Sequence, residues 1–100
     1  MSRKARVAEA LFVAAWTLLD SGHARRGFQK LMGAARLGHL AAQQGVGYLY
    51  DVGQGVKRSR TKAFYWYRRA ARRGDACAAT NIGILYKEAG SVRRAGARVH

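Results

Sequence analysis

The sequence predicts an all-α protein built from antiparallel helix pairs, with about five helices in all. Residues 28–56 and 64–92 share ten identical residues at a constant interval of 36, and a period of this size is typical of stacked structural repeats. Within each unit, apolar residues are spaced by three and four, which is the period of one helical face. The chain also contains no proline, the residue that most strongly interrupts helices.

The repeated positions are occupied mainly by small and apolar residues. They are Phe28/Phe64, Ala34/Ala70, Ala35/Ala71, Arg36/Arg72, Gly38/Gly74, Ala42/Ala78, Gly47/Gly83, Leu49/Leu85, Tyr50/Tyr86 and Val56/Val92, with Val46/Ile82 as a conservative pair. A single unit of this kind cannot bury its apolar face alone, so neighbouring units are expected to stack.

The first three helices follow from these faces in chain order. A first helix ends before Asp20, and a second covers about residues 23–37. A third covers about residues 39–51 and ends at Gly53 and Gly55, because glycine readily adopts the backbone conformation that stops a helix.

Two further helices complete the pattern. The fourth follows Ser59, a preferred N-cap residue, and runs to about residue 73 before Gly74. The fifth covers about residues 75–89, with Asp75 as its cap. The side chains expected to face the core are Leu11, Ala14, Ala15, Leu18, Leu19, Ala42, Val46, Leu49, Tyr50, Ala63, Trp66, Tyr67, Ala70, Ala71, Ala78, Ile82, Leu85 and Tyr86.

These elements predict a single domain over residues 1–100. Its units cover about residues 4–37 and 38–73, followed by an incomplete unit at 74–92 and a mobile tail at 93–100. An open repeat leaves its apolar face in water. We therefore expect a second copy of the chain to cover the incomplete unit, which would give a homodimer.

Two glycines lie inside the predicted helices at equivalent positions. Gly47 and Gly83 each cost about 1 kcal/mol of helix stability relative to alanine. Their shared register predicts that both lie at helix crossings, where the absent side chain lets another helix approach closely.

The residues around the middle unit resemble a known family, the Sel-one-like repeats (SLR), a branch of the tetratricopeptide-type repeats. The resemblance is carried by Gly38-His39-Leu40-Ala41-Ala42-Gln43, Val46-Gly47-Tyr48-Leu49-Tyr50, Gly53-Gln54-Gly55-Val56, Lys62-Ala63, Trp66-Tyr67, Ala70-Ala71 and Gly74. It implies a right-handed α-solenoid that acts as an adaptor for proteins or peptides. The chain departs from the family at Ser59, where an acid is usual. It also lacks the paired cysteines of the secreted members credited with β-lactam binding, so that activity is not carried over.

The polar residues form no catalytic set, and we expect neither enzyme activity nor a cofactor or metal. His23, His39 and His100 are scattered, without the spacing of metal ligands, and His39 is expected to have a structural role at a helix start. The single Cys77 excludes an internal disulfide and is expected to be a partly packed thiol.

The first helix of each pair would line the concave side of the solenoid. Its outward positions combine an aromatic residue, aliphatic residues and polar groups, which suits a peptide or protein partner. The predicted partner-binding groove consists of Val13, Thr17, Gln44, Tyr48, Asp51, Thr80, Ile84 and Lys87.

Positive charge offers an alternative function. The formal net charge is +14, from 19 Lys and Arg against 5 Asp and Glu, which favours acidic partners. Lys62, Arg69, Arg72 and Arg73 are predicted to project outward from the fourth helix, away from the groove. This basic face could bind nucleic acid, although cations near helix ends also interact favourably with the helix dipole. Protein binding is preferred because the charge lies mainly outside the groove.

The amino-terminal residues combine three bases, Arg3, Lys4 and Arg6, with the apolar run from Ala10 to Leu19. A secretory signal peptide has a similar layout, but Glu9 and Asp20 bracket the run, and the segment fits the repeat as a helix. We expect a cytoplasmic, bacterial-type protein without a membrane span, with export as the alternative if this segment is a signal peptide.

Overall fold

The computed structural model describes residues 2–99, with side chains up to residue 90, and this part of the chain is all-α, as predicted. Five helices follow one another along the chain: α1 (Arg3–Asp20), α2 (Ala24–Arg36), α3 (Leu40–Val52), α4 (Arg60–Arg72) and α5 (Ala76–Val99). None of them is both long and apolar enough to cross a membrane within the described residues.

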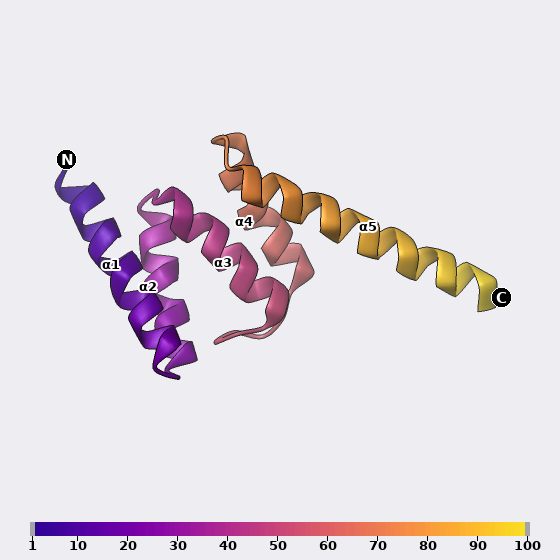
Figure 1. Ribbon diagram of the computed structural model, residues 1–100, viewed down its shortest axis with the longest axis horizontal. Helices are drawn as coiled ribbons and strands as arrows, with labels where there is room; N and C mark the ends of the chain where they lie inside the picture. The colour runs from indigo at the N-terminus through magenta and orange to yellow at the C-terminus, as the bar shows by residue number, and fades with distance from the viewer. Residues whose placement is uncertain (1, 100) are drawn as a thin grey trace.

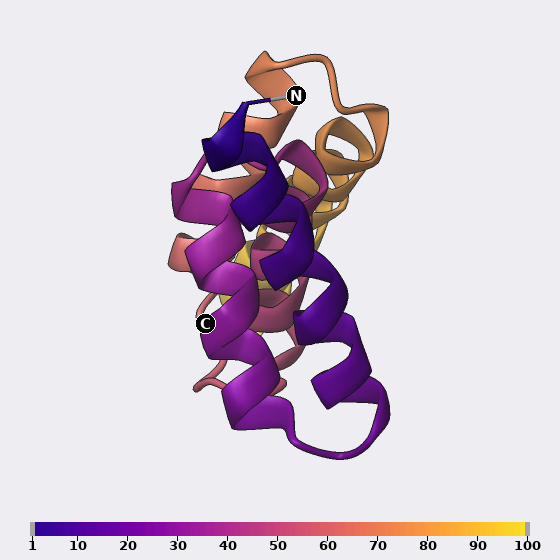
Figure 2. The ribbon, with the colours of Figure 1, turned by 90° about the vertical axis from the view of Figure 1, so that its left-hand side faces the viewer.

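The helices form a row of antiparallel pairs. α1 packs on α2, and α3 packs on α4; α2 also contacts α3, and α4 contacts α5. The result is an elongated molecule of 56 × 30 × 16 Å, with its two ends at opposite extremes of the long axis (Figure 1). A view turned by 90° shows α1 and α2 side by side, joined by a tight turn (Figure 2). Each helix therefore contacts its chain neighbours, as expected for a solenoid.

The predicted helix ends are largely confirmed. The Ser59 hydroxyl accepts a hydrogen bond from the Lys62 backbone N–H at 3.2 Å, which caps α4. α3 ends at Gly53, whose φ of 72° lies in the left-handed region that favours glycine. The loop that follows reaches back to α2 and places Gly55 against Ala24. A Cβ at position 55 would collide with the Ala24 carbonyl group, so glycine is required there.

The buried side chains come from all five helices and follow the predicted faces closely. The largest fully buried ones are Tyr67, Leu31, Leu49 and Val46. Around them lie Ala15, Leu19, Ala34, Ala35, Ala42, Tyr50, Ala63, Trp66, Ala70, Ala78 and Leu85. One predicted core residue, Tyr86, is exposed instead, because none of the described helices covers its side of α5.

The two equivalent glycines have different surroundings. A Cβ built on Gly47 would lie 2.6 Å from Cδ1 of Tyr67, so α4 does approach α3 closely there, as predicted. Gly83 has no neighbouring atom within 4 Å of such a Cβ, so its predicted helix crossing is wrong. A further close approach, which the sequence pattern does not indicate, lies at Gly27, where a Cβ would be 2.7 Å from Cγ of Leu19.

The last helix is longer than predicted. The sequence places its end near residue 89 and leaves residues 93–100 as a mobile tail, but the backbone of α5 stays helical to Val99. This segment contains alanine and arginine, which favour helix, and no proline. The side chains of residues 91–99 and all of His100 lie outside the described residues.

Candidate interaction surfaces

The predicted groove residues lie on the first helix of each pair, and we call them the first-helix face. Three of them are large apolar side chains in contact with solvent: Val13 on α1, Tyr48 on α3 and Ile84 on α5. Thr17, Thr80 and Lys87 are also exposed, whereas Gln44 and Asp51 are half-buried. Among these eight, Thr80 lines a hollow of about 260 Å³, together with Cys77.

Tyr48 and Ile84 occupy equivalent positions one repeat apart. Their side chains are 43% and 48% exposed, respectively. Tyr48 lies between the buried Gly47 and Leu49, and Ile84 precedes the buried Leu85. Consecutive units therefore present a large apolar side chain to solvent at the same position.

The predicted basic face is only partly assembled. Lys62 extends from α4 over the ring of Tyr50, with its Nζ 5.6 Å from the ring centroid. The Arg69 guanidinium lies over two rings of its own helix, 4.8 Å from the centroid of Trp66 and 5.7 Å from that of Tyr65. Arg72 is exposed. Stacking on aromatic faces partly fixes the cations of Lys62 and Arg69 in place.

Arg73 is separated from the other three bases. Its Nη1 donates hydrogen bonds to the Gly38 carbonyl at 2.5 Å and to Oε1 of the buried Gln43 at 3.4 Å. Gln43 in turn donates through Nε2 to the Ala35 carbonyl at 3.2 Å. Arg73 is exposed, and these hydrogen bonds tie the end of α4 to the turn between α2 and α3.

A basic hollow of about 400 Å³ lies on the outer side of α4. Its lining combines three guanidinium groups with two aromatic rings, and sequence analysis did not predict it as a unit. The residues that form it are Thr61, Phe64, Tyr65, Arg68, Arg69 and Arg72. Tyr65 is 55% exposed, which confirms the prediction that it points away from the core.

His39 has the structural role that the sequence predicts. Its Nδ1 accepts the Ala42 backbone N–H at 3.1 Å, which caps α3. Its Nε2 lies 2.7 Å from Oε2 of Glu9, and its ring stacks on Phe12 with centroids 4.4 Å apart. A neutral ring with the hydrogen on Nε2 satisfies both contacts. His39 thereby ties α3 to α1.

The described residues bring together no group of three His, Cys, Asp or Glu side chains that could hold a metal ion. Cys77 is exposed rather than partly packed, because it lies outside the face of α5 that carries the buried Ala78 and Leu85. The buried Tyr67 hydroxyl has no hydrogen-bond partner among the described residues. Burial raises its pKa, and the negative charge of Asp51 acts in the same direction, so this hydroxyl stays protonated at neutral pH.

The fold and its exposed faces define a helical repeat protein of the solenoid class. Residues 40–75 match the Sel1 repeat family. The crystal structure of a Sel1 repeat protein from Oxalobacter formigenes is 29% identical and superposes with a TM-score of 0.74, over 82% of this chain and 35% of that one. This chain thus spans about a third of the length of that protein. No curated protein sequence matches it significantly.

The family match over residues 40–75 and the likeness in structure agree with the resemblance to Sel1-like repeats that the sequence indicates. Proteins with such repeats generally mediate protein–protein interactions and are generally non-catalytic scaffolds.

Proposed function

We propose that this chain is a non-catalytic adaptor that binds a peptide or protein partner through the first-helix face. The observation that carries the proposal is the exposure of Tyr48 and Ile84 at equivalent positions of consecutive units. Large side chains of this kind, especially aromatic ones, are typical anchors in protein interfaces. Polar neighbours such as Gln44 and Thr80 can supply hydrogen bonds around them.

The positive charge of the chain suggests the chemistry of the partner. A net charge of +14 attracts acidic surfaces over distances of about 8 to 10 Å at physiological salt. An acidic peptide or protein is therefore the preferred partner. Self-association, the other partner expected from the sequence, would use the open side of α5 instead of this face.

The double variant Tyr48→Ala/Ile84→Ala tests the first-helix face. Both side chains are exposed, so we expect unchanged helicity and a loss of partner capture of about tenfold or more. Quantitative capture from native lysate, with circular dichroism as the folding check, measures both. Tyr65→Ala is the matched control, because it removes another exposed tyrosine, on α4. Undiminished capture by the double variant would move the binding site away from this face.

A second candidate function is nucleic-acid binding at the basic hollow of α4. One specific observation favours it: Arg68, Arg69 and Arg72 line one hollow together with the exposed Tyr65. Guanidinium groups suit phosphates, and an aromatic face can stack a base.

Charge reversal tests this second candidate. We expect any affinity for a single-stranded oligonucleotide to fall steeply with salt and to disappear in Arg69→Glu/Arg72→Glu, because each reversal removes a phosphate contact. Arg73→Glu is a useful comparison, since Arg73 donates to Gly38 and is expected to affect stability more than binding. Filter binding across a salt series measures the affinity. Weak binding at low salt, or binding that ignores the reversals, would eliminate this function.

A further inference from the structure

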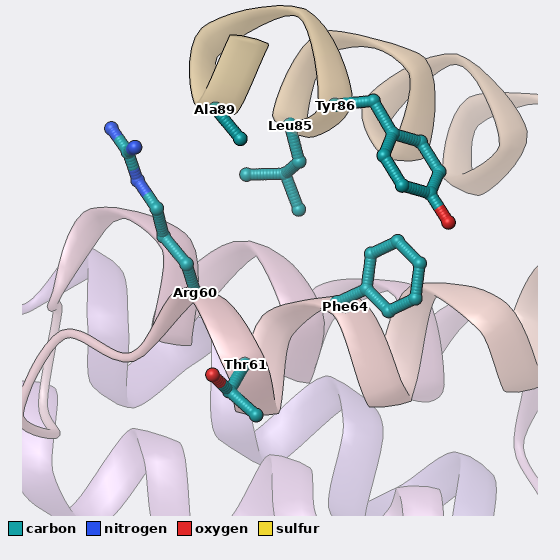
Figure 3. Close-up of a pocket in the computed structure, with 6 residues that line it drawn as sticks. All are labelled: Arg60, Thr61, Phe64, Leu85, Tyr86 and Ala89. Carbon is teal, nitrogen blue, oxygen red and sulfur yellow. The ribbon is translucent and has the colours of Figure 1, made fainter. Parts of the chain in front are cut away.

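The open side of the last unit contains an apolar groove between α4 and α5, which we call the terminal groove. Its outer part, with a volume of about 360 Å³, is lined by Arg60, Thr61, Phe64, Leu85, Tyr86 and Ala89. Leu85, Tyr86 and Ala89 point from α5 toward α4, and the Phe64 ring rises to meet Tyr86 (Figure 3). A second hollow of about 410 Å³ shares Phe64 and Tyr86 and adds Arg68, Ala71, Arg72 and Ile82.

The same groove occurs one repeat earlier, where it is filled. Phe28 meets Tyr50 edge-on with ring centroids 5.2 Å apart, and Phe64 meets Tyr86 in the same way at 5.2 Å. Tyr50 is only 8% exposed, however, whereas Tyr86 is 63% exposed. Two elements make the difference: α4, which packs on α3 and places Lys62 over the Tyr50 ring, and the loop after α3, which brings Gly55 against Ala24 and Phe28. Of these two, α4 is the element that covers the inner part of the groove.

The face of α4 that fills the earlier groove alternates small and aromatic side chains. Ala63 and Ala70 are fully buried, and between them Trp66 and Tyr67 are buried as well. The Tyr67 ring lies directly against Gly47. At the equivalent Gly83 the corresponding space is open. A helix with alanines and an aromatic ring at this spacing would therefore fit the terminal groove.

Charge indicates which residues would flank the apolar face of a helix bound in this groove. Arg60 is paired with Glu88 at 3.1 Å, but Arg68 and Arg72 belong to neither ion pair within the described side chains. Both line the second hollow. A second copy of the chain, with its own net charge of +14, would bring like charges together, which is unfavourable. An acidic helix would pair with these guanidinium groups instead.

We propose that the terminal groove binds an amphipathic helix of a partner protein, with a small-and-aromatic face toward Tyr86 and acidic residues beside Arg68 and Arg72. This is a second interaction surface, formed by α4 and α5, and it does not depend on the first-helix face. The helix would complete the third unit as α4 completes the second.

A labelled peptide derived from α4 tests the proposal. It has the sequence of residues 59–73 with every Lys and Arg replaced by glutamate, so it keeps Ala63, Trp66, Tyr67 and Ala70. We expect fluorescence anisotropy to show saturable binding to the full chain. Tyr86→Ala should weaken this binding about tenfold or more by removing an exposed anchor. Tyr48→Ala is the control and should bind like the parent.

Charge is tested separately in the same assay. Arg68→Glu/Arg72→Glu should weaken the binding of the acidic peptide about tenfold and weaken that of the unmodified basic peptide less, because the charge beside the groove changes from positive to negative. A scrambled acidic peptide of the same composition should bind weakly. Because Tyr86→Ala leaves the net charge unchanged, it distinguishes docking in the groove from general attraction to a basic protein. Thermal unfolding by circular dichroism should show that the exposed Tyr86 can be removed without loss of the fold.

Three results would overturn the proposal. Equal binding of the scrambled peptide would mean that charge alone attracts the probe. Unchanged affinity in Tyr86→Ala would place the peptide elsewhere. A doubled molecular mass of the parent in light scattering at micromolar concentration, lost in Tyr86→Ala, would assign the groove to a second copy of the chain.

Discussion

Replacement of Gly47 by leucine is expected to destabilise the protein by about 2 to 3 kcal/mol through overpacking. A Cβ at this position would lie 2.6 Å from Cδ1 and 2.7 Å from Cε1 of Tyr67. The Tyr67 side chain is fully buried, and protein interiors are close-packed, so a larger neighbour is expected to strain it. Urea unfolding followed by circular dichroism measures the change in the free energy of unfolding.

The matched control is Gly83→Leu, at the same position one repeat later. A Cβ there has no neighbour within 4 Å, so the variant should be at least as stable as the parent, because leucine favours helix more than glycine does. Comparison of the two variants distinguishes the effect of close packing on the free energy of unfolding from the effect of helix propensity. If Gly47→Leu unfolds like the parent, α4 and α3 do not require this close approach.

Replacement of Tyr67 by alanine is expected to cost about 3 to 5 kcal/mol, the range for loss of a large buried aromatic side chain. Tyr67 has the largest fully buried side chain described, and it lies between α3 and α4. Its hydroxyl has no hydrogen-bond partner among the described residues, so the cost should come from the ring. Tyr67→Phe should therefore retain most of the stability.

Tyr65→Ala is the control for Tyr67→Ala, because it removes a tyrosine from the same helix at a position 55% exposed. Its effect should stay within about 0.5 kcal/mol, as for most surface substitutions. Gly47→Leu combined with Tyr67→Ala should cost less than the two single variants added together, since leucine can occupy part of the space left by the ring. Strict additivity would show that the two positions do not share one packing site.

Local signals in the sequence were sufficient for most of the fold. The 36-residue interval and the spacing of residues such as Val46 and Leu49 define both the helices and their buried faces. The cap at Ser59 and the stop at Gly53 were predictable because each depends on residues within a few positions along the chain. The recurrence of glycine indicated the close approach at Gly47 correctly.

The errors occur where a residue's surroundings depend on distant parts of the chain. Gly83 and Tyr86 repeat Gly47 and Tyr50 in sequence, but their burial would need a following helix, which the described residues do not supply. Sequence periodicity specifies which side chains face a neighbouring helix and cannot specify whether that helix is present.

For the same reason, the sequence could predict only part of the candidate surfaces. The exposure of Tyr48 and Ile84 followed from helical periodicity, because they alternate with core positions. Arg73 was assigned to the basic face by its position on α4, but its contact with Gly38 spans 35 residues of sequence, and no local pattern indicates it. The terminal groove likewise arises from residues of two helices and becomes visible only when α4 and α5 are packed together.

Capture of partners from native lysate, with and without nuclease, tests the central claim that this chain binds proteins through its first-helix face. The parent chain should capture the same proteins in equal amounts after nuclease treatment, and Tyr48→Ala/Ile84→Ala should lose them by about tenfold or more. Tyr65→Ala should behave like the parent. Capture that disappears with nuclease, and that survives in the double variant, would contradict the claim and assign the function to the basic hollow of α4.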